Sequence, residues 1–423
     1  MLSAQQAEAL ILDLVQPLHP QRDLEILDLR SAPGRILATP ASSVLDFPLW
    51  DNSAMDGYAV RYEDVKVCST EQPAILEIVE EIPAGYQPQK NIQSGQAARI
   101  LTGSMMPTGA DTIVVQEETR RSGRFVTLFS APKPHAFVRR QAEFYQAGQP
   151  LLPAGIRLSA AEIAVLATAQ CTQVPVYRRP RIAILSTGSE LVLPDQPLQP
   201  GQIVDSNQYA LAALVASAGA EPICLGIVPD QQESLKAAIA QAISIADVVI
   251  SSGGVSVGDY DYVDRTLTEL RAEIHIRAVA VKPGRPLTVA SFKATQSQEP
   301  ELPHLLSPVL YFGLPGNPVS ALVTFWRFVQ PALRKLSGLA DDWQTPCVEG
   351  RSLQDLRSDG KRETYLWGKT HLVQGKYEFS LAGGSQSSGN LINLAQTNSL
   401  AVIPIGQTLK TSGEAIQIML VMP

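Results

Sequence analysis

Between about residues 179 and 337, short apolar runs alternate with helical segments, and this alternation constrains the fold more than any other feature. The runs RIAILST, PICLGIV and DVVIS are typical of buried strands, and NQYALAALVASAG and QQESLKAAIAQAISI are typical of helices. Strand-like runs continue at HIRAVAVK, LTVASF and VLYFG, with a polar stretch at 294–308 that predicts a long hairpin loop. The pattern predicts a doubly wound α/β sheet, in which ligands bind beyond the carboxyl ends of the strands.

The rest of the chain predicts three further parts. Residues 46–148 are rich in glycine, proline and strand-forming residues, which indicates an inserted small β domain. Residues 1–45 and 149–178 flank that insertion and predict one helical/β linker domain. Residues 338–423 return to short β runs and predict a small C-terminal β-barrel domain beside the α/β domain of residues 179–337. Several domains are expected for 423 residues, because single cores rarely exceed about 250–300 residues.

Composition argues against several classes of function. The chain has 34 Lys and Arg residues and 41 Asp and Glu residues, a formal charge of −7, so neither nucleic acid nor a membrane surface is an expected partner. No apolar run approaches about 18 residues, and the first residues resemble a helix rather than a signal peptide. The four cysteines and five histidines are scattered, which argues against a zinc cluster and favours reduced thiols in the cytoplasm.

The strand DVVIS is followed by small residues and then by carboxylates. Small residues let a ligand approach the backbone, whose N–H groups can hold an anion. Asp261 would hold Mg²⁺, which neutralises phosphate oxygens. For such a loop taken by itself, a turn without a ligand is the better alternative. The small residues that we expect to contact a ligand are Ser251, Gly253, Gly254, Ser256 and Gly258.

Similar chemistry follows two other strands of the predicted sheet. The first strand is followed by two hydroxyl groups, a glycine that permits a tight turn, and a carboxylate. A carboxamide precedes the next helix and another carboxylate follows the second strand, although either could simply cap a helix. These residues are Ser186, Thr187, Gly188, Glu190, Asn207 and Asp230.

Two proline-glycine turns complete the set. Lys282 and Arg285 place positive charge beside the first turn, where both cations suit oxyanions, and two surface cations are the alternative. The second turn precedes a helix that could begin at Asn317 with proline in its first position. The turn residues are Pro283, Gly284, Pro315, Gly316 and Asn317. Together these strand ends predict a polyanionic ligand handled with a divalent metal.

Six motifs occur in order along the chain: DNSAMDGYA, RILTGSMMPTGADTIVVQEE, STGSEL, SSGGVSVGDYDY, KPGRP and GLPGNPVSA. In these motifs the chain resembles the MoeA family of molybdopterin molybdenumtransferases, which includes the gephyrin E domain. The resemblance covers nearly the whole chain and implies an elongated four-domain subunit and a homodimer with its active site at the subunit interface. It also implies an activity, in which adenylated molybdopterin and molybdate react with Mg²⁺, AMP leaves, and molybdenum enters the dithiolene.

The resemblance also implies roles for individual residues. The catalytic residues that it implies are Asp56, Thr102, Glu190, Asp230 and Asp261. Those that would also hold the metal are Asp56, Glu190 and Asp261. Arg139 and Ser388 are further matches that would contact the substrate. From the residues alone, the polar positions around residues 51–60 and 99–118 are explained equally well as turn residues.

Two positions depart from the family pattern. An acidic position after the β insertion is Phe144, and a lysine position four residues before Lys282 is Ala278. The adjacent Arg277 would point to the opposite side of a strand. These losses leave open a second function, a paralogue that binds molybdopterin or its adenylate as a carrier or scaffold. A different pyrophosphate-cleaving enzyme is a third possibility, which the DNSAMDGYA motif opposes, and the retained carboxylates favour an active transferase.

Overall fold

The computed structural model describes residues 1–254, 262–294, 305 and 307–421. The chain divides into two compact units. The first contains residues 1–39, 154–159 and 174–423, and the second contains residues 40–153 and 160–173. Within the described part of the chain, none of the helices combines the length and apolar character that a membrane crossing requires.

The first unit is built on a six-stranded sheet in the order β16-β13-β17-β21-β20-β18. The first four strands are parallel, and β20 is antiparallel to both of its neighbours. The predicted α/β sheet is confirmed, as is the hairpin pairing of β20 with β21, whose loop lies mostly outside the described residues. The strands are β13 (Arg181–Thr187), β16 (Glu221–Val228), β17 (Val248–Ser252), β18 (Glu273–Ala278), β20 (Pro286–Phe292) and β21 (Val309–Leu314).

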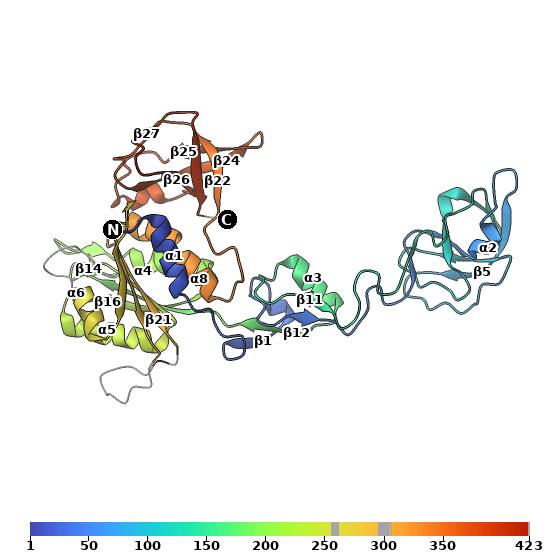
Figure 1. Ribbon diagram of the computed structural model, residues 1–423, viewed down its shortest axis with the longest axis horizontal. Helices are drawn as coiled ribbons and strands as arrows, with labels where there is room; N and C mark the ends of the chain where they lie inside the picture. Colours follow the sequence, from blue (N-terminus) through green and yellow to red (C-terminus); the bar gives the residue numbers. More distant parts are fainter. Residues whose placement is uncertain (255–261, 295–304, 306, 422–423) are drawn as a thin grey trace. The chain divides into compact units, whose positions relative to one another are not determined.

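Helices cover both faces of this sheet, with α5 and α6 on one face and α1, α4, α7 and α8 on the other (Figure 1). Ile182 and Ile184 of β13 are buried in the cluster on the α4 side, and Ala183 and Leu185 are buried on the α5 side. Burial on both faces explains why these strands are apolar throughout. The helices are α1 (Ala4–Leu14), α4 (Asn207–Ser217), α5 (Gln232–Ile245), α6 (Tyr262–Glu269), α7 (Pro318–Thr324) and α8 (Gln330–Leu336).

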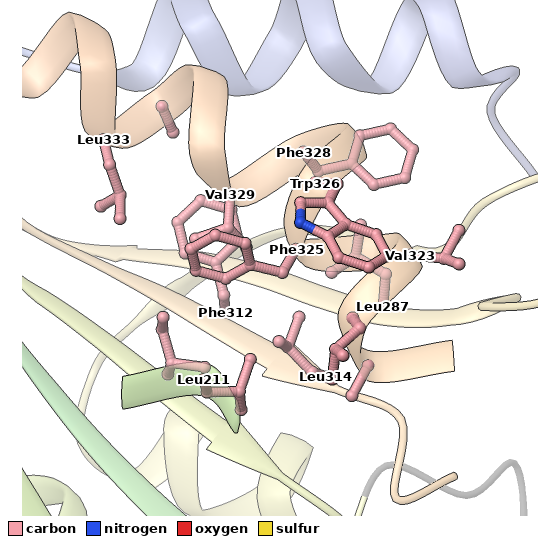
Figure 2. Close-up of a cluster of buried hydrophobic side chains, with 14 of the residues drawn as sticks. Leu211, Leu287, Phe312, Leu314, Val323, Phe325, Trp326, Phe328, Val329 and Leu333 are labelled. Atoms are coloured by element: carbon pink, nitrogen blue, oxygen red, sulfur yellow. The ribbon is translucent and has the colours of Figure 1, made fainter. Parts of the chain in front are cut away.

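A π-helical turn, Phe325–Val329, connects α7 to α8. Phe325 and Val329 belong to the same buried cluster as Phe312 of β21 (Figure 2). Because this cluster is fully enclosed, α7 is held against β21, and its first residue, Pro318, is fixed beyond the carboxyl end of that strand.

The C-terminal residues form a closed five-stranded barrel in the order β24-β25-β22-β28-β26, with β26 pairing back to β24. The predicted barrel is confirmed. The predicted strand HIRAVAVK is broken: its last residues form β19 (Val281–Lys282), which pairs with β24 rather than with the α/β sheet. The barrel strands are β22 (Cys347–Ser352), β24 (Glu363–Val373), β25 (Lys376–Leu381), β26 (Ser399–Ile403) and β28 (Ala415–Leu420).

The second unit contains a six-stranded sheet in the order β7-β4-β6-β5-β9-β8, which agrees with the β-rich insertion expected from the sequence. A short strand, β3 (Asn52–Ser53), pairs with β10 (Val138–Arg139). Two α-helices, α2 (Tyr62–Val65) and α3 (Ala160–Thr168), also belong to this unit. The sheet strands are β4 (Gly57–Val60), β5 (Ala74–Ile82), β6 (Gln96–Ile100), β7 (Thr112–Val115), β8 (Thr119–Ser122) and β9 (Phe125–Leu128).

Candidate functional site

A cavity of about 470 Å³ opens at the carboxyl ends of the four parallel strands in the first unit. Thr187 contributes from β13, Asp230 from beyond β16, Ser252 from β17 and Pro315 from beyond β21. Strands β13 and β17 are neighbours, although the chain passes through β16 between them. The cavity therefore lies where the strand order reverses, which is the usual ligand position in such sheets.

Most residues predicted from the strand ends meet at this cavity. They come from separate stretches of sequence that the parallel topology brings to one edge. The predicted residues that line it are Ser186, Thr187, Gly188, Glu190, Asn207, Asp230, Gly253, Gly254, Pro315, Gly316 and Asn317. Asp205, Ser252 and Ser320 also line the cavity and were not among the predicted contacts.

Ser251, a predicted ligand contact, does not line the cavity, whereas the next residue, Ser252, does. Its side chain is buried on the opposite face of the sheet, where its hydroxyl lies 2.5 Å from the Tyr311 hydroxyl. Side chains alternate along a strand, so Ser252 faces the cavity instead. Asn207 Nδ2 donates to Ser252 Oγ at 2.7 Å. The sequence SS alone contains no information about which serine faces which side.

Two glycines form the part of the cavity next to Thr187. Gly253 has φ of 95° and Gly254 has φ of 68°, both in the left-handed region that favours glycine. A Cβ atom on Gly253 would lie 2.3 Å from the carbonyl oxygen of Thr187, and one on Gly254 would lie 2.7 Å from its Oγ1. Glycine is therefore required here, as the prediction of close ligand approach to the backbone assumed.

Three buried polar atoms beside the cavity lack a hydrogen-bond partner among the described residues: Ser186 Oγ, Thr187 Oγ1 and Asn207 Oδ1. Buried polar groups are normally paired, because an unpaired one carries a desolvation cost of about 1–3 kcal/mol. A polar ligand in the cavity would supply the missing partners.

The cavity wall is acidic. Glu190, Asp205 and Asp230 line it, and no Lys, Arg or His side chain is among its described lining residues. The Asp205 carboxylate is engaged, because it accepts hydrogen bonds from the backbone N–H groups of Asn207 and Gln208. The exposed Glu190 carboxylate has no such partner among the described residues. A polyanionic ligand would therefore need a cation between itself and this wall.

The structure decides the capping alternatives stated for Asn207 and Asp230, and Asn207 is the first residue of α4 rather than its cap. Asp205 caps the first turn of α4, as its hydrogen bonds to the helix N–H groups show. Asp230 does not cap α5; instead its Oδ2 accepts from Ser189 N at 3.4 Å, and its own N–H donates to Ser189 Oγ at 3.4 Å. Asp230 thus connects the end of β16 to the loop that carries Glu190.

The two cations of the KPGR turn are not at this cavity. Lys282 Nζ forms an ion pair with Asp359 Oδ2 at 3.2 Å. Asp359 has its pKa lowered to about 2, mainly by the backbone N–H of Lys361, with smaller effects from Lys282 and Arg362. Arg285 is exposed and lines a different hollow, beside residues 275–278.

The residues between those cations are also absent from the cavity lining. Pro283 and Gly284 form a turn packed on α7, where a Cβ on Gly284 would lie 2.5 Å from Thr324 Oγ1. Only Pro286, which follows the turn, reaches the cavity. The expected contact of Lys282 and Arg285 with a ligand is therefore not found at the cavity of the first unit.

Three predicted residues, Ser256, Gly258 and Asp261, lie outside the described residues. Ser388 lies in the described part, in a loop that follows β25. Asn317 Nδ2 donates to its Oγ at 3.2 Å, and the N–H of Val319 donates to its carbonyl oxygen at 3.1 Å. Asn317 thus precedes α7 as predicted, but its side chain bonds Ser388 rather than capping the helix.

The second unit contains Asp56, Thr102 and Arg139. Asp56 Oδ1 accepts from both the N–H and the hydroxyl of Thr102, each at 2.7 Å. These two hydrogen bonds hold the pKa of Asp56 below its ordinary value. Arg139 pairs with Asn52 across strands β10 and β3. The structure thus brings three distant motifs together within this unit.

Comparison with known proteins identifies the family. Models of the MoeA N-terminal region (domain I and II), a probable molybdopterin binding domain, and the MoeA C-terminal region (domain IV) match residues 2–169, 183–335 and 349–421. The chain belongs to the MoeA family. It is 61% identical over 419 residues to a molybdopterin molybdenumtransferase of Nostoc sp., covering 99% of this chain and 94% of the relative. A Haemophilus influenzae protein of the same name is 37% identical, covering 82% and 80%.

Solved MoeA structures agree with this assignment. The molybdopterin biosynthesis MoeA protein of Pyrococcus horikoshii OT3 superimposes with a TM-score of 0.82 at 28% identity, covering 99% of this chain and 100% of that one. A second structure of this kind, from Pyrococcus horikosii, gives 0.79 at 28% identity, with both chains fully covered. The multidomain α/β fold with a small C-terminal β barrel is therefore confirmed as a MoeA-like fold.

The two departures from the MoeA pattern are visible in the structure. Phe144 is 68% exposed in the second unit, and its N–H donates to the carbonyl of Phe47 at 2.8 Å. Ala278 is half-buried at the end of β18, and the neighbouring Arg277 forms an ion pair with Asp264 at 2.6 Å. Arg277 therefore has a carboxylate partner of its own.

Proposed function

We propose that this MoeA-family chain is a molybdopterin molybdenumtransferase, which inserts molybdenum from molybdate into adenylated molybdopterin and releases AMP. One observation carries the proposal: hydroxyls and a carboxylate without hydrogen-bond partners among the described residues meet ligand-accessible glycine backbone in the cavity at the carboxyl ends of the parallel strands. The carrier or scaffold alternative is not favoured, since relatives at 61% and 37% identity are transferases by name.

The residues at the strand ends would hold the pyrophosphate. The backbone at Gly253 and Gly254 allows close approach, and the hydroxyls of Ser186 and Thr187 can donate to phosphate oxygens. Because the wall is acidic, we assign Mg²⁺ to this site, with Glu190 as a carboxylate beside it. When bound, the ion would neutralise phosphate charge during cleavage of the phosphoanhydride.

The described residues fit Mg²⁺ as a shared ion rather than a caged one. Among them, no group of three His, Cys, Asp or Glu side chains lies close enough to hold a metal. Mg²⁺ is commonly bound through one or two carboxylates plus substrate phosphates and water, so Glu190 fits that mode. Asp261, which lies outside the described residues, is the second carboxylate that the family resemblance implies. Asp56, kept anionic by Thr102, is the third proposed acidic participant.

Three finer points belong to the same proposal. We infer a homodimer with its active site at the subunit interface, to which Asp56, Thr102 and Arg139 contribute. Exposed apolar side chains near these residues support a protein partner there, among them Trp50 at 43% and Phe137 at 48% exposure. We also retain the four-domain division at residues 45, 148, 178 and 337 and a cytoplasmic location.

Glu190→Gln is expected to lower the rate of AMP release by about 100-fold without changing the fold. The substitution keeps shape and removes the negative charge that would lie beside Mg²⁺. The measurement is AMP released from adenylated molybdopterin by purified protein, with molybdate and Mg²⁺ varied independently. A higher Mg²⁺ requirement in the variant would accompany the loss.

Glu221→Gln is the matched control, because Glu221 is an exposed glutamate at the first position of β16, at the end of the strand far from the cavity. Its activity should equal that of the wild type. Wild-type protein that releases no AMP when both ions are present would overturn the proposed function. Full activity of Glu190→Gln would remove only the role assigned to that residue.

A further inference from the structure

Gln208 does not line the cavity, yet its buried side chain connects Asp205, which does, to strand β16. Its Nε2 donates to Asp205 Oδ2 at 3.2 Å, and its Oε1 accepts from the N–H of Gly226 at 2.9 Å. Gln208 is 5% exposed and Asp205 is 2% exposed. The carboxamide thus joins the first turn of α4 to strand β16, and both its nitrogen and its oxygen form hydrogen bonds.

Gly226 lies at a break in the register of β16. Ile184 of β13 pairs with Cys224, but the next residue, Leu185, pairs with Gly226, so β16 contains one extra residue at this point. Such a bulge leaves a backbone group without its regular partner, and bulges are common next to active sites. Gln208 supplies the partner for the Gly226 N–H.

The bulge determines how β16 reaches the cavity. Shifting the register by one residue turns every later side chain to the other face of the sheet. With the bulge, Val228 is buried in the cluster on the α5 side, and its carbonyl accepts from the N–H of Gly188 at 3.3 Å. Asp230 follows and bonds Ser189 in both directions. The position of the loop carrying Glu190 thus depends on the bulged strand.

Asn207, the neighbouring residue on α4, makes the complementary connection. Its Nδ2 donates to Ser252 Oγ at 2.7 Å and to the carbonyl of Gly316 at 2.8 Å. Asn207 therefore links the first turn of α4 to β17 and to the loop after β21. The adjacent Gln208 links the same turn to β16. Together they connect three of the four strand ends.

We propose that Gln208 is a positioning residue for the transferase reaction, which holds Asp230 and the Gly188–Glu190 loop in place through the β16 bulge. The assignment rests on the proposed function. Gln208 acts through these residues and touches no substrate.

The groups around Gln208 make a sharp test possible. Asp205, from the preceding loop, is hydrogen-bonded to Gln208, and Cys224 lies two residues before Gly226 on β16. Burial and the charge of Asp205 both raise the pKa of the Cys224 thiol, so that thiol is neutral at ordinary pH. A glutamate at position 208 would face the Asp205 carboxylate in a buried setting, which raises its own pKa.

Gln208→Glu is expected to show a pH-dependent loss of activity. When protonated, its carboxyl group can donate to Asp205 and accept from Gly226, as the carboxamide does; when ionised, it repels Asp205. The kcat/KM for AMP release, relative to wild type, should be at least about 10-fold lower at pH 8.5 and recover to within about threefold at pH 6. Gln208→Met, which loses both hydrogen bonds, should show a loss that does not depend on pH.

Gln330→Glu is the matched control, because it makes the same substitution at a half-buried glutamine on α8 whose side chain contacts Thr345. The kcat/KM of this control for AMP release, divided by that of the wild type, should be the same at pH 6 and pH 8.5. Amide hydrogen exchange of the segment 222–230, compared with wild type at the same pH, should rise in Gln208→Glu at pH 8.5 and not in the control.

The outcomes separate the two proposals. The positioning role would be overturned if the kcat/KM of Gln208→Glu relative to wild type did not change with pH. It would also be overturned if the loss of activity arose because the variant unfolds below the assay temperature. If the wild type releases no AMP, the proposed function fails, and hydrogen exchange still tests whether Gln208 holds the bulge. Unchanged exchange in segment 222–230 would then refute the assignment by itself.

Discussion

Gly253→Ala is expected to reduce AMP release by at least about 100-fold, because the new methyl group displaces the backbone that forms the cavity. A Cβ at this position would lie 2.3 Å from the Thr187 carbonyl oxygen, an approach that requires movement of the main chain. The φ of 95° adds strain for any residue with a side chain. Misplacement by about 1 Å at a reacting centre is enough for a loss of this size.

Gly201→Ala separates the effect of the steric clash with the Thr187 carbonyl from the effect of backbone strain at a positive φ. Gly201 has a similar φ of 88°, but a Cβ there would meet nothing within 4 Å. We expect this variant to lose about 1 kcal/mol of stability and to keep its activity. AMP release should be measured for both variants under conditions where circular dichroism shows them folded. Gly253→Ala with at least half of wild-type activity would show that the cavity does not depend on this close approach.

Arg178→Ala is expected to lower the free energy of unfolding of the first unit by about 3 kcal/mol. The guanidinium group bonds both oxygens of Asp247, at 2.7 and 2.8 Å, and Nε donates to Asp23 Oδ1 at 3.1 Å. The side chains of Asp23 and Asp247 are only 7% and 13% exposed. Removing the arginine leaves the nearly buried Asp247 carboxylate without its arginine partner and takes one of several partners from Asp23. An uncompensated buried charge costs more than the pair contributes when intact.

This destabilisation should depend on pH in a defined direction. Burial raises the pKa of Asp23, but hydrogen bonds from Arg22 and His19 and the charge of Arg178 outweigh burial, so the pKa lies below its ordinary value. A depressed carboxylate pKa stabilises the folded state above the unfolded-state pKa, and this contribution disappears as pH falls through the folded-state pKa. The difference between wild type and variant should therefore be complete above about pH 5 and shrink below about pH 4.

Arg22→Ala is the control for that experiment. Arg22 also bonds Asp23, at 2.8 Å, but its side chain is 54% exposed, and exposed ion pairs contribute less than about 1 kcal/mol. Chemical denaturation of both variants, followed at pH 7 and pH 3.5, measures the two effects. A loss of similar size for Arg22→Ala and Arg178→Ala would contradict the special role of the buried pair.

Sequence reasoning predicted the α/β sheet well because its strands and helices have strong, distinct patterns. RIAILST and DVVIS are buried on both faces, and their lengths match β13 and β17. The convergence of Thr187, Asp230 and Gly316 followed from topology, since parallel strands present their carboxyl ends at one edge. The C-terminal barrel was also predicted, but not which strands close it, because closure depends on β26 pairing with β24 over a long sequence separation.

Other features could not be predicted because they depend on contacts distant in sequence. Which of Ser251 and Ser252 faces the cavity depends on the face that Tyr311 occupies. The charges of Lys282 and Arg285 suggested ligand contact, but the structure gives Lys282 an acidic partner from the barrel. Gln208 has no sequence pattern of its own, and its role became visible only through the one-residue shift between β13 and β16.

The two-residue strand β19 has a consequence for dissecting this chain. It leaves the α/β sheet after β18, pairs with β24 through Val281 and Lys282, and returns as β20. The α/β sheet and the barrel are therefore connected by strand pairing at a segment between β18 and β20, in addition to the chain connection that follows α8. A shortened protein that ends after α8 would leave β19 without its neighbour and the KPGR turn without support. The barrel thus stabilises the KPGR turn, through the pairing of β19 with β24 and the ion pair between Lys282 and Asp359.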